Sequence, residues 1–195
     1  MKLFFSCVSC LFPLFLFAGP FGFEVGKTIS DYPDVVFEKI EACNTCYQVK
    51  NVPAPNKLME LYSIRHTIKS GICFIKGLSK NIETSKYGVE LNIKYNSVFQ
   101  SLDNKYKSTH RKEKINFLAS ESIWNEPGDY MIALLKKERY MYTQWQAKDS
   151  SNKILKIFLL QNAINQEKGY LTIEYYGNNK KDCDAEDSAD EADGF

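Results

Sequence analysis

The sequence contains only two histidines, His66 and His110, among its 195 residues. Neither is accompanied by a serine, a cysteine or a paired carboxylate in a recognisable pattern, so a catalytic triad has no support. The G-x-S-x-G, H-E-x-x-H and Walker motifs are also missing. The carboxylate pair of a glycoside hydrolase need not be close in sequence, and no such pair stands out. The sequence therefore favours a non-enzymatic protein, with no catalytic residue, no cofactor and no metal ion.

The sequence also has no arginine-rich run and no RNA-binding motif with spaced aromatic residues, so we expect no specific nucleic-acid partner. Seven acidic residues and no basic one lie in residues 182–195. Without these seven and Lys2, the 25 basic and 24 acidic residues of the chain become 24 and 17, which gives residues 19–181 a net charge of +7. A basic body attracts anionic surfaces, so a protein or an anionic envelope component is the expected partner. Residues 182–195 have too few apolar side chains to fold and predict a disordered acidic tail.

Long apolar runs are missing except at the start of the chain. An uncharged stretch of about 15 residues, Leu3–Phe17, follows Lys2 and is broken by Pro13. A helix needs roughly 20 apolar residues to span a membrane. The small residue Ala18 offers a cleavage site, so residues 1–18 predict a signal peptide and an exported protein, periplasmic or secreted. An uncleaved anchor and a buried first helix are the alternatives. We expect no transmembrane segment in the mature protein.

Four cysteines follow this leader: Cys43, Cys46, Cys73 and Cys183. In an oxidising compartment an even number favours two disulfides. Three pairings are formally open, and we prefer Cys43–Cys46 with Cys73–Cys183. The C-x-x-C spacing also suits redox catalysis or zinc. A redox site would place the pair after a strand at a helix start, and a zinc site would need a second closely spaced pair. Neither context is present.

Hydrophobic periodicity predicts an α+β domain over residues 19–181, with an antiparallel sheet of about five strands and two to three helices packed on one face. The clearest signal is the amphipathic pattern of residues 89–106. The expected helices are 31–42, 89–106 and 130–137; the expected strands are 61–68, 72–78, 140–147, 154–164 and 169–176; the expected loops are 50–57 and 107–114.

Tyrosines gather on the C-terminal strands, at Tyr140, Tyr142, Tyr170 and Tyr176. Tyrosine is common at protein interfaces because it combines apolar area with a polar tip. It also simply favours β-strands. If Tyr140 and Tyr142 are exposed, the sheet becomes a candidate binding face.

Residues Pro20-Phe21-Gly22-Phe23-Glu24-Val25-Gly26 resemble the mature start of a family of small, uncharacterised exported bacterial proteins. Those proteins begin with Pro-Phe-Gly-Phe-Glu-x-Gly and continue into a short helix. Residues 86–91 and 134–140 resemble the same family, so the resemblance covers most of residues 20–183 and implies a compartment and a fold, but no site. Gly26-Lys27-Thr28 is more loosely similar to outer-membrane assembly accessory lipoproteins and β-lactamase-inhibitor-like domains. Lysine replaces the methionine of that motif and the lipobox cysteine is missing, which argues against a membrane anchor.

Together these features predict a non-enzymatic exported domain that binds a protein or an envelope component through its sheet or its basic surface. The alternative is a thiol–disulfide enzyme that uses Cys43 and Cys46. The sequence makes no prediction of the oligomeric state.

Overall fold

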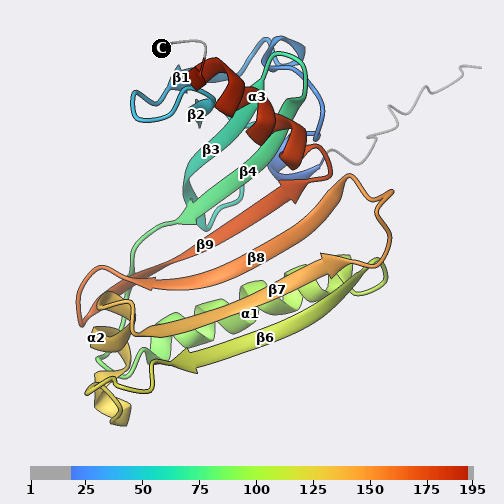
Figure 1. Ribbon diagram of the computed structural model, residues 1–195. Helices are drawn as coiled ribbons and strands as arrows, with labels where there is room; N and C mark the ends of the chain where they lie inside the picture. The colour runs from blue at the N-terminus through green and yellow to red at the C-terminus, as the bar shows by residue number, and fades with distance from the viewer. Residues whose placement is uncertain (1–18, 193–195) are drawn as a thin grey trace, which may run out of the picture.

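The computed structural model describes residues 19–192, which form one antiparallel β-sheet of nine strands with helices on both faces (Figure 1). The strand order is β1-β2-β3-β4-β9-β8-β7-β6, and β5 also pairs with β9. The α+β class is confirmed, but the expected number of about five strands is wrong. The predicted signal peptide, residues 1–18, and the end of the predicted tail, residues 193–195, lie outside the described residues.

The elements follow one another along the chain in this order: 3-10 helices η1 (Pro20–Gly22) and η2 (Ile29–Asp31), strands β1 (Val36–Lys39), β2 (Cys46–Lys50), β3 (Met59–Thr67), β4 (Gly71–Ser79) and β5 (Ile82–Glu83), helix α1 (Val89–Tyr106), strand β6 (His110–Leu118), 3-10 helix η3 (Pro127–Asp129), helix α2 (Tyr130–Leu135), strands β7 (Arg139–Ala147), β8 (Ile154–Ala163) and β9 (Lys168–Gly177), and helix α3 (Lys180–Ala192).

Helix α1 has the bounds that its hydrophobic pattern predicts, and it lies across one face of the sheet, called here the inner face. Tyr95 is fully buried, and its hydroxyl is 2.6 Å from that of Thr143 in β7. Burial raises the pKa of Tyr95 to about 12, although the hydrogen bond with Thr143 opposes this shift. Asp103 accepts a hydrogen bond of 3.2 Å from the indole of Trp145, also in β7. These two contacts fix the position of α1 over β7.

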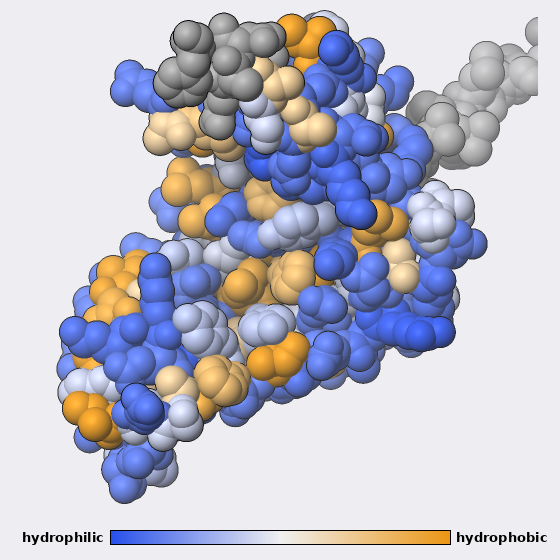
Figure 2. All heavy atoms as spheres, viewed as in Figure 1, coloured by the Kyte–Doolittle hydropathy of each residue, from blue (hydrophilic) through white to orange (hydrophobic). Residues whose placement is uncertain are grey.

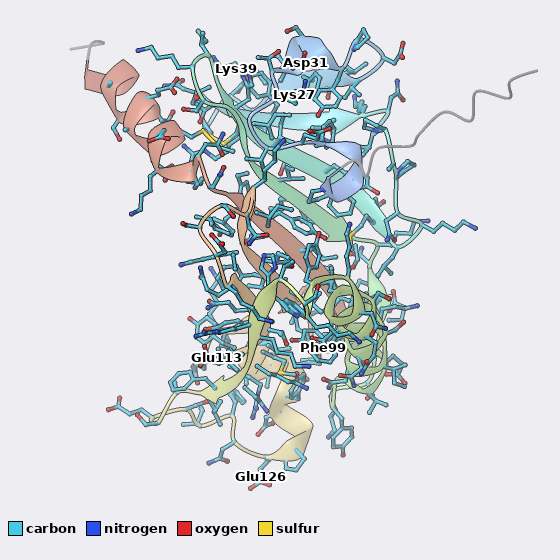
Figure 3. All side chains as sticks on the ribbon, turned by 90° about the vertical axis from the view of Figure 1, so that its right-hand side faces the viewer. Lys27, Asp31, Lys39, Phe99, Glu113 and Glu126 are labelled. Carbon is cyan, nitrogen blue, oxygen red and sulfur yellow. A yellow bond between two sulfur atoms is a disulfide. The ribbon has the colours of Figure 1, made fainter. Side chains whose placement is uncertain are left out.

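The helices do not all lie on one face, which corrects the sequence-based expectation. Helices α1 and α2 pack on the inner face, and α3 lies on the opposite, outer face, as Figure 3 shows in side view. Pairing across the strands identifies the outer face. Arg65 stands opposite Phe74, and Phe74 stands opposite Tyr176. The Arg65 guanidinium forms ion pairs of 2.8 Å with Asp184 and 2.7 Å with Asp187 of α3.

Helix α3 occupies residues for which the composition predicts disorder. The prediction rests on the small number of apolar side chains in this segment. The helix is instead held on the sheet by a disulfide, ion pairs and hydrogen bonds. Cys183 in its first turn is bonded to Cys73 of β4, Arg65 binds two of its carboxylates, and Glu186 accepts hydrogen bonds from the Ser70 hydroxyl and the Lys69 amide. The acidic segment therefore finds its cationic and disulfide partners in the β3–β4 hairpin.

The attachment of α3 is expected to weaken in acid. Burial raises the pKa of Asp184, but Lys180 and Arg65 outweigh burial and lower it below 3.8. The hydrogen bond from Ser70 lowers the pKa of Glu186 below 4.5. Both carboxylates therefore stabilise the folded state fully at pH values above their ordinary pKa values. This stabilisation is lost as the pH falls through their lowered pKa values in the folded protein. Urea unfolding as a function of pH measures this loss. Arg65→Ala should partly flatten the dependence below pH 4.5, since Lys180 still acts on Asp184 and Ser70 on Glu186. An equally steep profile in that variant would contradict the assignment.

The N-terminal region differs most from expectation. The helix predicted for residues 31–42 is wrong, because Val36–Lys39 form β1 and pair with β2 across the turn that holds Cys43 and Cys46. Phe21, in a left-handed conformation with φ of 56°, packs edge-on against Tyr62 at 4.9 Å. A Cβ on Gly77 would lie 2.8 Å from the Phe21 ring. The start of the described chain is therefore fastened to the sheet rather than to a helix.

Strand β6 occupies part of the segment that the sequence predicts to be a loop, residues 107–114. Two of its inner-face positions carry lysines, Lys112 and Lys114. The ammonium of Lys112 lies 5.1 Å from the Phe99 ring of α1, and that of Lys114 lies 5.7 Å from the Tyr95 ring. Each ammonium group thus lies over an aromatic face of α1, the geometry of a cation–π contact.

Candidate functional site

Aromatic side chains cross the outer face of the sheet from β4 to β7. Phe74, Tyr176, Phe158 and Tyr142 follow one another on β4, β9, β8 and β7, with ring-centroid distances of 4.9, 5.5 and 6.0 Å. We call these four residues the aromatic stripe. Each ring leans on the next at a tilted or edge-on angle, the geometry that aromatic pairs prefer. The sheet therefore holds the rings at fixed positions.

A depression of about 240 Å³ lies beside the stripe, over β7, β8 and β9. Figure 2 shows apolar atoms gathered in the middle of this face, below α3. No helix of residues 19–192 covers it. The exposed fraction of Tyr140 at its edge is 47%, and that of neighbouring Phe117 is 52%. The depression is lined by Tyr140, Tyr142, Phe158, Leu160, Glu174 and Tyr176.

One carboxylate, that of Glu174, lines the depression. It forms an ion pair of 3.1 Å with Lys76 and accepts a hydrogen bond of 2.9 Å from the Tyr176 hydroxyl. Burial, reinforced by the charge of Glu174, raises the pKa of Tyr176 above its ordinary value, so the hydroxyl stays protonated. The charge of Glu174 is thus balanced and its oxygens are occupied. The depression thus combines apolar and aromatic side chains with one paired carboxylate.

The structure places all four tyrosines singled out in the sequence on the outer face. Tyr140, Tyr142 and Tyr176 meet in the depression. Tyr170 stands opposite Asn162, outside it. The sequence analysis missed Phe158 and Leu160, which lie between the tyrosine-bearing strands. The two residues are two positions apart in a predicted strand, so the sequence indicates that they share one face of it. Only the strand register shows that this is the face that carries Tyr142 and Tyr176.

The two preferred disulfides, Cys43–Cys46 and Cys73–Cys183, are both present. Cys43 and Cys46 lie in the turn between β1 and β2, half-buried, beside Arg65 in a cavity of about 520 Å³. Neither sits at the start of a helix, the position that activates the thiol in thioredoxin-like enzymes. The Cys73–Cys183 disulfide is fully buried and joins the sheet to α3. Its role is structural.

Both histidines are buried, including His110, which the sequence analysis placed in a charged loop. Burial lowers the pKa of both rings, opposed at His66 by Glu186 and at His110 by the hydrogen bond to Ile154. His110 Nε2 donates to the Ile154 carbonyl oxygen at 3.0 Å, so Nδ1 accepts from the Thr109 hydroxyl at 2.9 Å. His66 has no side-chain hydrogen bond among the described residues. Neither ring is hydrogen-bonded to both a nucleophile and a carboxylate, as a triad requires.

Within residues 19–192, no group of three or more histidine, cysteine or acidic side chains is placed to hold a metal ion. In the same part of the chain, no helix has both the length and the apolar character needed to cross a membrane. Comparison with family models, curated proteins and solved structures finds no match to this chain. The outer face and its depression are thus the basis for a proposed function.

Proposed function

We propose that the chain is a non-enzymatic binding domain that acts outside the cytoplasm and binds a protein partner through the depression on its outer face. The observation that carries this proposal is the uncovered aromatic surface on β7, β8 and β9. Buried tyrosine and phenylalanine side chains supply much of the energy of protein interfaces. Here they stand on a rigid sheet, so little side-chain entropy is lost when a partner covers them.

Three features support action outside the cytoplasm. Both disulfides are of the kind that persists in oxidising compartments. The leader-like residues 1–18 have the pattern of an export signal. The stretch Pro20–Gly26 resembles the mature start of the exported bacterial family, and we propose membership of that family on this resemblance.

A site-specific photocrosslinker tests the binding face. Placed at Tyr140 on the outer face, it is expected to capture one defined protein in cells that make the chain. Placed at Ile93, which is 64% exposed on α1 at the other face, it should not. Combining the Tyr140 crosslinker with Tyr142→Ala and Phe158→Ala should weaken the captured complex about 30-fold, the size of an interface hot spot. Thermal unfolding checks that this variant folds. Equal capture from both positions, or none from either, contradicts the proposal.

A thiol–disulfide enzyme remains the alternative, favoured by one observation. The Cys43–Cys46 disulfide borders an open cavity beside the Arg65 guanidinium, and a nearby cation lowers the pKa of a thiol. An insulin-reduction assay, with Cys43→Ser as its control, separates the two functions. Activity that this substitution abolishes would replace the binding proposal.

A further inference from the structure

A second concave surface lies on the inner face, between α1 and the loop that leads into β3. Its volume is about 450 Å³, within the range of small-molecule sites in proteins. The sheet separates it from the depression on the outer face. We call it the inner groove. Its apolar floor is formed by Phe21, Met59, Val98, Leu102, Ile173 and Tyr175.

The rim of the inner groove is cationic. Lys57 and Lys94 line it, and no aspartate or glutamate does. Among the described residues, neither lysine lies within 4.0 Å of a carboxylate. Glu90, one turn before Lys94 on α1, is bonded instead to the Thr84 hydroxyl and the Ser85 amide, each at 2.9 Å. Two cations without protein counter-charges therefore flank an apolar floor.

The floor also holds one polar group, the hydroxyl of Tyr175. Tyr175 lines the groove and has an exposed fraction of only 5%. Among the described residues, no hydrogen bond to its hydroxyl is found, and the nearest aromatic neighbours, Phe21 and Tyr106, meet it ring to ring. Burial, together with the Tyr106 hydroxyl, keeps the group protonated by raising its pKa. The hydroxyl is not among the described polar atoms that are sealed from solvent and lack a partner, so it reaches the solvent that fills the groove and can donate to an acceptor oxygen of a bound molecule.

We propose that the inner groove binds a single-chain amphiphile with an anionic head, either a carboxylate or a phosphate. The alkyl chain covers the apolar floor, and the head lies between Lys57 and Lys94. Charge complementarity excludes a cationic head, since no carboxylate stands at the rim to receive it. The apolar floor excludes a free inorganic anion as the full ligand, because it would leave that surface exposed to water. The groove is independent of the outer face, so this proposal does not rest on the proposed protein partner.

Calorimetric titration of the purified protein tests the ligand class. The probes are sodium dodecanoate, dodecyl phosphate, dodecyltrimethylammonium and inorganic phosphate, each below the concentration at which it forms micelles. Both anionic amphiphiles are expected to bind at least tenfold more tightly than the cationic one, with no saturable binding of inorganic phosphate. The methyl resonance of Met59, whose side chain lines the groove, should shift on binding. A preference for the carboxylate or for the phosphate head supports the proposal and identifies the natural head group.

Matched lysine variants test the site. Lys57→Ala with Lys94→Ala is expected to weaken dodecanoate binding at least tenfold without lowering the thermal stability. Lys105→Ala, on the same helix but outside the groove, should leave the affinity unchanged. The proposal is overturned by equal affinity for the cationic amphiphile, by unchanged affinity in the double variant, or by binding that leaves the Met59 resonance in place.

Discussion

The double substitution Cys73→Ser, Cys183→Ser is expected to lower the free energy of unfolding by about 4–5 kcal/mol. The two cysteines are 110 residues apart, and the disulfide between them removes much of the conformational entropy of the unfolded chain. Without it, α3 is held to the outer face by polar contacts such as the ion pairs of Arg65, whose side chains are 20–49% exposed. Pairs of that kind contribute little. Most of α3 should then detach from the β3–β4 hairpin.

The second disulfide provides the matched control. Cys43 and Cys46 are only three positions apart, so the same entropy argument gives Cys43→Ser with Cys46→Ser a loss of about 2 kcal/mol. Urea unfolding followed by tryptophan fluorescence measures both variants, and hydrogen exchange reports on α3. Equal destabilisation by the two double substitutions would show that loop length does not set the contribution of the long-range disulfide.

Trp145→Ala is expected to lower the free energy of unfolding by about 3–5 kcal/mol. Trp145 is completely buried on the inner face of β7, where its ring lies 5.7 Å from that of Phe99. Its indole also donates to Asp103, and this hydrogen bond joins one from Lys112 in lowering the pKa of the carboxyl group. Alanine would leave a cavity between α1 and the sheet and remove the donor.

Two further variants divide this effect. Trp145→Phe keeps an aromatic ring but removes the indole donor, so a loss of about 1–3 kcal/mol is expected. Trp124→Ala removes the other tryptophan of the chain, which is half-buried before η3, and should cost about 1 kcal/mol. Circular dichroism follows the unfolding of all three variants, because Trp145→Ala and Trp145→Phe remove the fluorescence of Trp145 itself. A loss in Trp145→Ala no larger than in Trp124→Ala would contradict the central role of Trp145.

The sequence predicts best those elements that bury a continuous apolar stripe against one partner. Helix α1 matches residues 89–106 because Leu91, Tyr95 and Leu102 recur at helical spacing and all face the sheet. The β3–β4 hairpin and strands β7, β8 and β9 also fall close to their predicted ranges. In these strands, buried apolar residues on one face alternate along the sequence with more exposed residues on the other.

The elements that the sequence missed depend on partners far away in the chain. Strand β6 has lysines at inner positions whose ammonium groups lie over rings of α1, and single-strand periodicity cannot show this. Strand β1 depends on pairing with β2. Helix α3 depends on Arg65 and on Cys73. The candidate site was predictable only in part for the same reason. Its tyrosines could be identified in the sequence, but their contact with Phe158 depends on the strand register.

The position of β9 in the sheet has a consequence for the order in which the fold forms. Strand β9 pairs with β4 on one side and with β8 on the other, and it is the one link between β1–β4 and β6–β8 in the described sheet. It begins at Lys168, so the two halves of the sheet cannot join until the segment beyond that residue is available. Until then β4 presents an unpaired edge, a feature that promotes association between chains. The two halves of the sheet are therefore expected to join only late in folding, when β9 closes this edge.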